Sequence, residues 1–209
     1  MPHTLATLDE SIGPEVRPPG RLSRDLAAYN RAMAIQAGTY RLGPDNATLR
    51  VKTGRHGAAA KAGHDLVIEV TSWEATLTVA DDPASSSVEL SADPTSLHVL
   101  KGEGGLQELG DDDKADIRKT IDKDVLKKKD IAFSSSNVAA SDDGLSVTGD
   151  LTMGGKSKPV SFTLAGDGGS ITGSATVKQK DWGIKPYQAL FGALKVNDEV
   201  TVEVEGSLT

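Results

Sequence analysis

The sequence lacks cysteine altogether and is poor in aromatic residues. Its 209 residues include only two tryptophans, three tyrosines and three phenylalanines. The absence of cysteine excludes disulfides, thiolate metal sites, iron–sulfur clusters and cysteine nucleophiles. The scarcity of aromatic rings leaves few platforms on which nucleic-acid bases could stack. A chain of this length can still bury a sizeable core as one domain.

Charge and the lack of long apolar runs narrow the possible partners. The chain has 23 basic and 30 acidic residues, a net charge of -7, so it repels a phosphate backbone and we expect no nucleic-acid partner. No stretch approaches the roughly 20 apolar residues that span a bilayer, so we expect no transmembrane segment. The first thirty residues also lack the apolar core of a signal peptide. These features together predict a cytoplasmic protein.

The N-terminal region differs from the rest of the chain. Residues 1–20 are rich in proline and glycine and predict a disordered arm. An amphipathic helix is predicted after it, because four apolar side chains share one helical face: Leu22, Leu26, Tyr29 and Met33. We expect this helix to pack on the sheet domain, to form a lid, or to make the contact of a homodimer. We therefore divide the chain into an arm with a short helix over residues 1–37 and a barrel domain over residues 38–209.

From Gly38 onward, apolar and polar residues alternate with a period of two, which is typical of strands with one buried face. The clearest example lies at the C-terminus, where the apolar set is Val200, Val202 and Val204. The apolar residues of the alternation occupy even-numbered positions in residues 66–70 and odd-numbered positions in residues 73–79. This change predicts a bend at Thr71-Ser72. Turn-forming sequences separate further short segments without helices between them, which favours an antiparallel sheet.

One helix is predicted within the sheet sequence, over residues 111–129. Its apolar stripe has i, i+4, i+8 spacing and consists of Ile117, Ile121 and Val125. Three aspartates, Asp111 to Asp113, begin the segment and three lysines, Lys127 to Lys129, end it. This charge arrangement complements the helix dipole.

Tests for catalytic and metal-binding motifs are largely negative. His56, His64 and Asp65 are too isolated to indicate a metal site. Gly154 to Ser157 resembles the end of a P-loop, but Asp150 stands where that motif requires glycine, so we interpret the segment as a hairpin turn. The sequence therefore predicts neither a catalytic set nor a metal.

A small closed barrel either packs its interior with side chains or encloses an apolar ligand. Several positions expected to point inward are small: Ala75, Ala92, Ala132, Gly173 and Ala175. A cavity and a solid core both remain open on this pattern.

Four segments together resemble the YceI-like family. Residues 147–160 read VTGDLTMGGKSKPV and are similar to the family's V-x-G-x-L-T-x-x-G-x-x-K-P-V hairpin. Asp181 to Ile184 is similar to its D-[FW]-G-I loop. Residues 60–66 and 131–135 match in the expected order, so the resemblance covers about residues 38–208. Family members often carry an arginine shortly before the D-[FW]-G-I loop, whereas Lys178, Gln179 and Lys180 stand here.

This resemblance implies an all-β fold: an extended eight-stranded antiparallel lipocalin-like β-barrel with one inserted helix and the N-terminal helical arm. It implies a non-enzymatic carrier or sequestering protein for an isoprenoid-like lipid, with no other cofactor. A quinone, a polyprenyl phosphate or another lipid could be the ligand. The residues expected to line the lumen are Leu66, Ile68, Val70, Trp73, Phe133, Phe162 and Leu164. Those expected at the mouth are Trp182, Tyr187 and Phe191. Lys178, Lys180 or Lys185 either meets an anionic head group or is ordinary surface.

Two other functions remain open. The first is a barrel isomerase or cyclase for an apolar substrate, with His64 and Asp65 as the acid/base pair. Adjacent strand residues point to opposite faces, which disfavours this pair. The second is a stress-linked interaction protein that holds no ligand.

Overall fold

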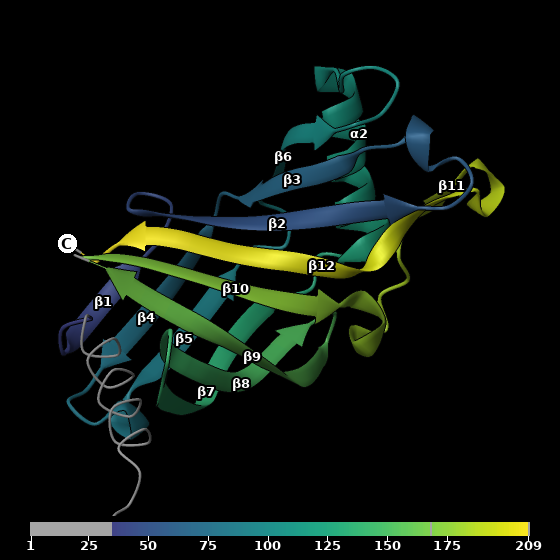
Figure 1. Ribbon diagram of the computed structural model, residues 1–209. Coiled ribbons are helices and arrows are strands. Elements are labelled where there is room, and N and C mark those ends of the chain that lie inside the picture. The colour runs from purple at the N-terminus through teal and green to yellow at the C-terminus, as the bar shows by residue number, and fades with distance from the viewer. Residues whose placement is uncertain (1–34, 168, 209) are drawn as a thin grey trace, which may run out of the picture.

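The described part of the chain is a curled antiparallel sheet with one helical insertion (Figure 1). The computed structural model describes residues 35–167 and 169–208. The strands are β1 (Gly38–Leu42), β2 (Ala47–His56), β3 (Asp65–Val70), β4 (Trp73–Val79), β5 (Ser87–Ala92), β6 (Leu97–Glu103), β7 (Ile131–Ser141), β8 (Gly144–Met153), β9 (Lys156–Asp167), β10 (Ser170–Lys178), β11 (Gln188–Ala189) and β12 (Leu194–Ser207). The helical segments are α2 (Asp111–Thr120), the π-helical turn η3 (Ile121–Val125), and the short 3-10 turns η1 (Ala60–Ala62), η2 (Pro83–Ser85), η4 (Gln179–Trp182) and η5 (Leu190–Gly192).

All of the strands belong to one sheet, in which every pairing is antiparallel. The strand order is β1-β4-β5-β7-β8-β9-β10-β12-β2-β3-β6, and β11 pairs with β12. β3 pairs with β2 and β6, whereas β4, which follows it directly, pairs with β1 and β5. The first strand in this order, β1, pairs with β4, and the last, β6, pairs with β3. Because β3 and β4 follow each other directly in the chain, the two ends of the order lie close together and the sheet curls back toward itself.

The predicted bend at Thr71-Ser72 is confirmed, since β3 ends at Val70 and β4 begins at Trp73. The partner strands bend at the same level, where the backbone N–H of Thr71 donates to the Ser96 carbonyl at 3.0 Å and that of Asp93 to the Ser72 carbonyl at 2.9 Å. Such bends, together with the turn at residues 43–46, divide three long runs in two. With the short additional strand β11, the described residues consequently form twelve strands where eight were expected.

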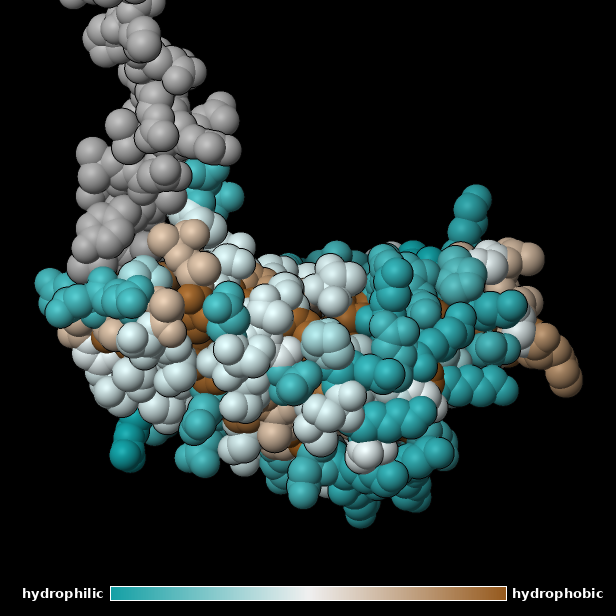
Figure 2. All heavy atoms as spheres, turned by 90° about the horizontal axis from the view of Figure 1, so that it is seen from below, coloured by the Kyte–Doolittle hydropathy of each residue, from teal (hydrophilic) through white to brown (hydrophobic). Residues whose placement is uncertain are grey.

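The alternation of side chains separates a polar outer face from an apolar interior. In β4 the inward residues Trp73, Ala75, Leu77 and Val79 are all buried. Figure 2 shows mainly hydrophilic and neutral residues on the face that it presents, with hydrophobic colour largely confined to the gaps between them. The period-two pattern thus directs the apolar side chains to the core.

One residue that was assigned to the arm belongs to the core. Ile35 is 1% exposed, and Gly166 of β9 lies against it so closely that an added Cβ would be 2.2 Å from Ile35 Cγ1. The rest of the expected arm and its amphipathic helix, residues 1–34, lies outside the described residues. Sequence periodicity did not predict this contact, because Ile35 does not belong to the apolar stripe of the expected helix.

The inserted helix begins where predicted and ends earlier. It starts at Asp111, and the Asp113 carboxylate accepts a hydrogen bond from the Gly110 N–H at 3.0 Å, which caps the N-terminus. It does not reach residue 129: η3 ends at Val125, and Lys127 and Lys128 have positive φ angles of 56° and 54°. The lysines therefore follow the helix in a turn and do not form its last turn.

Candidate functional site: an apolar cavity inside the sheet

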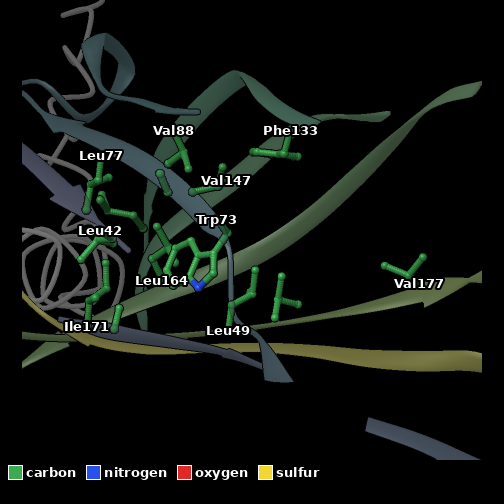
Figure 3. Packing of buried hydrophobic residues seen from close by; sticks show 14 of the residues in the cluster. Leu42, Leu49, Trp73, Leu77, Val88, Phe133, Val147, Leu164, Ile171 and Val177 are labelled. Atoms are coloured by element: carbon green, nitrogen blue, oxygen red, sulfur yellow. The ribbon is translucent and has the colours of Figure 1, made fainter. Parts of the chain in front are cut away.

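The interior of the curled sheet contains a cavity of about 850 Å³. This volume lies within the range typical of small-molecule sites. All seven residues that were expected to face the lumen line it: Leu66, Ile68, Val70, Trp73, Phe133, Phe162 and Leu164. Figure 3 shows several of these side chains converging from different strands on the interior. Whether they bind a ligand is a separate question from their position.

The bend between β3 and β4 explains why Val70 and Trp73 both point inward. A straight strand would place residues three apart on opposite faces. The two residues of the bend reset the parity, so both side chains are buried and both line the cavity. Phe133 and Phe162 contribute the only ring pair recorded in the described residues, with centroids 5.3 Å apart and a tilted geometry.

The C-terminal strand forms another wall. Val200, Val202 and Val204 all line the cavity and are half-buried instead of fully buried. Ala175 of β10, the register partner of Val202, lies in the same wall. Gly173 has a different role, because a Cβ at this position would lie 2.7 Å from Leu164 Cδ2. Its small size therefore serves packing between neighbouring strands.

The helical insertion supplies a wall that was not assigned to the cavity from sequence. Ile117, Ile121 and Val125 all line it. The helix α2 packs beside β6, which is the last strand of the pairing path and has one edge that pairs with none of the described strands. Covering a sheet edge with a helix protects it from pairing with another chain. The i, i+4, i+8 stripe was the sequence signal for this wall.

Polar side chains gather where β2 ends and β3 begins, and most of their polar atoms have partners within the protein. The Arg55 guanidinium donates through Nε to the Ala60 carbonyl at 2.6 Å and through Nη1 to the Glu103 carbonyl at 2.9 Å. Arg55 Nη1 also lies 2.8 Å from Asp65 Oδ2. His64 lines the cavity, and its Nε2 is 2.7 Å from the Gln107 carbonyl oxygen. Because Asp65 pairs with Arg55 and His64 with a backbone carbonyl, the two do not form an acid/base pair.

The three residues expected at the mouth have different environments. Tyr187 lines the cavity and is 47% exposed. Trp182 is buried outside the lining, where its Nε1 donates to the Leu151 carbonyl at 2.9 Å. Phe191 is the fully exposed middle residue of η5, with a φ of 55°, and it does not line the cavity either. Sequence spacing did not distinguish these positions, because all three follow β10 in short 3-10 turns and loops that have no regular alternation.

Lys178 and Lys180 before the 181–184 loop and Lys185 after it are all exposed. Lys178 Nζ is 3.5 Å from Glu199, and Lys180 Nζ is 3.8 Å from Asp198. Gln179 between them is buried, lines the cavity, and donates to the Asn197 carbonyl at 2.9 Å. Gln179 therefore places a polar side chain in the cavity wall just before the loop.

Two structural findings bear on other kinds of site. Within residues 35–167 and 169–208, no cluster of three histidine or acidic side chains could hold a metal ion. None of the helices in the same residues has the length and apolarity needed to cross a membrane.

The family model described as the YceI-like domain matches residues 40–208. The chain belongs to the YceI-like family. The match extends from β1 to the end of the described chain and so includes every wall of the cavity. The crystal structure of BcnA from Burkholderia cenocepacia has a similar fold, with a TM-score of 0.54 and 20% identity over 76% of this chain and 94% of that chain. At this identity the likeness concerns the fold alone.

Curated relatives of this YceI-like chain are UPF0312 proteins from strains of Pseudomonas aeruginosa and from Pseudomonas paraeruginosa. The Pseudomonas aeruginosa proteins are 36% identical over 92 residues, which cover 39% of this chain and 47% of the relatives. The Pseudomonas paraeruginosa protein matches to the same extent. The matched region therefore spans about half the length of these relatives.

Proposed function

We propose that the protein is a non-enzymatic carrier or sequestering protein for an isoprenoid-like lipid held inside the sheet. The observation that carries this proposal is the 850 Å³ cavity, most of whose lining residues are aliphatic or aromatic. Burial of one methylene group contributes about 0.8 kcal/mol, so a chain of several isoprene units can bind without any head-group contact. The family membership supports the same function.

The lipocalin-like barrel architecture is part of this proposal. If the bent pairs β1/β2, β3/β4 and β5/β6 each form one long strand, they and β7, β8, β9, β10 and β12 make eight strands. Small eight-stranded barrels have interiors wide enough for one small ligand. The helix would then close the gap left beside β6.

An isomerase or cyclase finds less support. Its acid/base pair would be His64 and Asp65, but Asp65 Oδ2 forms an ion pair with Arg55 at 2.8 Å and His64 Nε2 lies 2.7 Å from the Gln107 carbonyl oxygen. General acid–base catalysis requires both groups within hydrogen-bond reach of the substrate. A protein with no ligand is the remaining alternative, and the experiment below distinguishes it.

The decisive experiment is ligand binding by protein that has been refolded from a lipid-free denatured state. Titration with the isoprenoid alcohol geranylgeraniol should show about one equivalent bound and a negative heat-capacity change, the marker of apolar burial. Mass spectrometry of organic extracts should identify the lipid that copurifies. Failure to extract any lipid, together with no binding of geranylgeraniol or longer isoprenoids, would refute the carrier function.

Two further expectations accompany the proposal: a homodimer, which sedimentation analysis can test, and a cytoplasmic location, which cell fractionation can test. Neither is required for the cavity to bind a lipid.

A further inference from the structure

Exposed apolar side chains gather at one end of the sheet, in the turn that follows β11. The exposed large hydrophobic residues of the described chain include Tyr187, Leu190 and Phe191, which stand close together in the sequence. Leu190 is 56% exposed and Phe191 is fully exposed, and neither lines the cavity, whereas Tyr187 does. We call Tyr187, Leu190 and Phe191 the apolar tip.

The backbone of the apolar tip has an unfavourable conformation. Leu190 and Phe191 have φ angles of 51° and 55°, both in the left-handed region. Leucine and phenylalanine adopt this region rarely, and asparagine adopts it more readily. Two consecutive large apolar residues that are both strained and exposed contribute little to the core of the protein. Strain kept at such a position indicates a contact with something outside the chain.

The turn between β2 and β3 lies beside the apolar tip (Figure 1). The Ala59 N–H donates to the Ala193 carbonyl at 2.9 Å, just after η5. A Cβ on Gly63 would lie 2.7 Å from Leu194 Cδ1. Residues 56–64 and 185–197 therefore form one surface at this end of the sheet.

This surface contains lysines and no acidic residue. Residues 56–64 read HGAAAKAGH and residues 185–197 read KPYQALFGALKVN, in a chain whose net charge is -7. Lys61 and Lys185 are exposed, and Lys195 extends beside the tip, where a Cβ on Gly192 would be 3.7 Å from Lys195 Cε. No ion pair joins these three lysines to any residue within 35–167 and 169–208.

The two acidic residues that directly border this surface are paired with basic side chains. Asp65 lies 2.8 Å from Arg55, and Asp198 lies 3.8 Å from Lys180. Charges separated by more than about 8 Å are largely screened at physiological ionic strength. The lysines near the tip therefore set the local potential, although the whole chain is acidic.

A second copy of the chain fits this surface poorly. A stable interface buries about 800 Å² on each partner, and three side chains of one turn supply only part of that area. Two tips in contact would also bring their lysines together, and like charges repel.

An anionic membrane surface fits both the apolar and the basic residues. Aromatic side chains favour the level of the lipid head groups, and lysine stems lie along apolar surface while their ammonium groups reach toward water and phosphate. Each lysine near an anionic bilayer adds to the attraction.

We propose that the apolar tip inserts into the head-group region of an anionic lipid bilayer, with Lys61, Lys185 and Lys195 contacting the lipid phosphates. This docking places Tyr187, and with it the cavity mouth, against the membrane. The proposal goes beyond the carrier function and does not depend on it, because Leu190 and Phe191 do not line the cavity.

The first test is sedimentation of the full chain with vesicles made of equal parts phosphatidylcholine and phosphatidylglycerol. The wild type should bind these vesicles, bind less at high salt, and bind pure phosphatidylcholine vesicles much more weakly. The double variant Leu190→Asn/Phe191→Asn should bind the anionic vesicles about tenfold more weakly or worse, because it removes the inserted apolar groups. Asparagine suits the left-handed backbone, so the turn should keep its shape.

Two triple variants test the electrostatic part. The first removes the lysines of the docking surface: Lys61→Gln, Lys185→Gln and Lys195→Gln. The control removes lysines that pair with acidic side chains elsewhere: Lys52→Gln, Lys101→Gln and Lys119→Gln. The first should weaken binding to the anionic vesicles by about tenfold or more, and the control should weaken it far less. Both change the net charge equally, so a general charge effect would weaken both to the same extent.

A fluorescent residue at the tip reports insertion directly. Both native tryptophans, Trp73 and Trp182, are buried. Phe191→Trp should retain binding, and its added fluorescence should be quenched by brominated lipids in the anionic vesicles. Thr172→Trp is the matched control, because Thr172 is exposed and pairs with Glu205, roughly 35 Å along β12 from Leu194 at 3.3 Å per residue. Its fluorescence should not be quenched.

The outcomes separate this proposal from the carrier function. Equal binding to vesicles with and without phosphatidylglycerol, or unchanged binding by the double asparagine variant, would overturn the docking. A slower sedimentation of that variant than of the wild type without vesicles would overturn it too, because the tip would then be a contact between copies. Vesicle binding through the tip without any binding of geranylgeraniol or longer isoprenoids would refute the carrier function alone.

Discussion

At the residue scale, Ile35 and Gly166 form a contact that links the start of the described chain to β9. Ile35 is 1% exposed, and no side chain could stand at Gly166 without displacing it. The glycine is therefore required here for space and not for backbone conformation, since its φ is not in the left-handed region.

Substitution of both residues tests this contact. Ile35→Ala should destabilise the protein by about 2–5 kcal/mol, as for other buried isoleucines. Gly166→Ala alone should cost about 1–3 kcal/mol through overpacking. The double variant should lose less than the sum, because the shortened Ile35 leaves room for the new methyl group. Urea unfolding measures all three, and strict additivity would contradict the assigned contact.

Asp93 lies in the bend between β5 and β6, and local hydrogen bonds shift the pKa of its carboxyl group. The backbone N–H and the hydroxyl of Thr95 both donate to Asp93 Oδ1 at 2.8 Å. The backbone bond first, and the hydroxyl bond second, lower the pKa of the carboxyl below its ordinary value. Because the folded pKa is lowered, the ionised carboxylate stabilises the fold above the unfolded pKa, and this contribution is lost as pH falls through the folded pKa.

A ¹³C NMR titration should find the Asp93 pKa below the ordinary value for aspartate. Thr95→Ala should raise that pKa partway, because the backbone donor remains. Ser96→Ala is the matched control: the Ser96 hydroxyl donates to the Asp93 carbonyl oxygen and not to its carboxylate. An Asp93 pKa that ignores Thr95→Ala, or that moves equally with Ser96→Ala, would be inconsistent with this assignment.

At the element scale, β12 shows how one strand separates a cavity wall from the outer surface. Val202 lines the cavity between its register partners Val51 and Ala175. The next residue, Glu203, points to the other face and pairs with Lys52 at 2.6 Å in a partly exposed position.

Val202→Asp should cost several kcal/mol, because it places an unpaired charge among apolar side chains. Glu203→Gln should cost no more than about 1 kcal/mol, since exposed ion pairs contribute little. Comparison of the urea midpoints at constant m value gives both numbers. Equal losses from the two variants would mean that the faces of β12 are assigned wrongly.

The apolar face of the helical insertion follows from its sequence, but the position of its C-terminal end does not. Its apolar stripe predicted a buried face, and all three residues of the stripe line the cavity. Its end was predicted at Lys129, but η3 ends at Val125. Lysines are good helix formers and complement the helix dipole, so local preference favoured a longer helix. The chain instead turns to reach β7 at Ile131.

At the scale of the whole molecule, the cavity inside the sheet is the property on which the proposed function depends. Ala175→Trp should fill part of the cavity and weaken geranylgeraniol binding while the protein stays folded, at a cost of about 1–3 kcal/mol from overpacking. Thr176→Trp is the control, because Thr176, the next residue on β10, is exposed and does not line the cavity. Calorimetric titration of both variants gives the result. Equal affinities in wild type and Ala175→Trp would show that the ligand does not occupy this cavity.

The sequence by itself determined the features that depend on local spacing. The period-two alternation predicted the strands, the change of parity predicted the bend at Thr71-Ser72, and the apolar stripe predicted the helix. These could be predicted because strand and helix geometry fix which neighbours share a face. The seven expected lumen residues line the cavity for the same reason. Their role in ligand binding stays a prediction.

The tertiary structure alone decided the features that depend on contacts between distant segments. It buried Ile35 against Gly166, bonded Trp182 to Leu151, exposed Phe191 and left the Trp73 indole nitrogen without a partner among residues 35–167 and 169–208. It also decided that the interior contains a cavity and is not a solid core. Alternation states only which side chains point inward. Whether they meet depends on how far the sheet curls and on what the helix covers, and no local pattern in the chain records those distances.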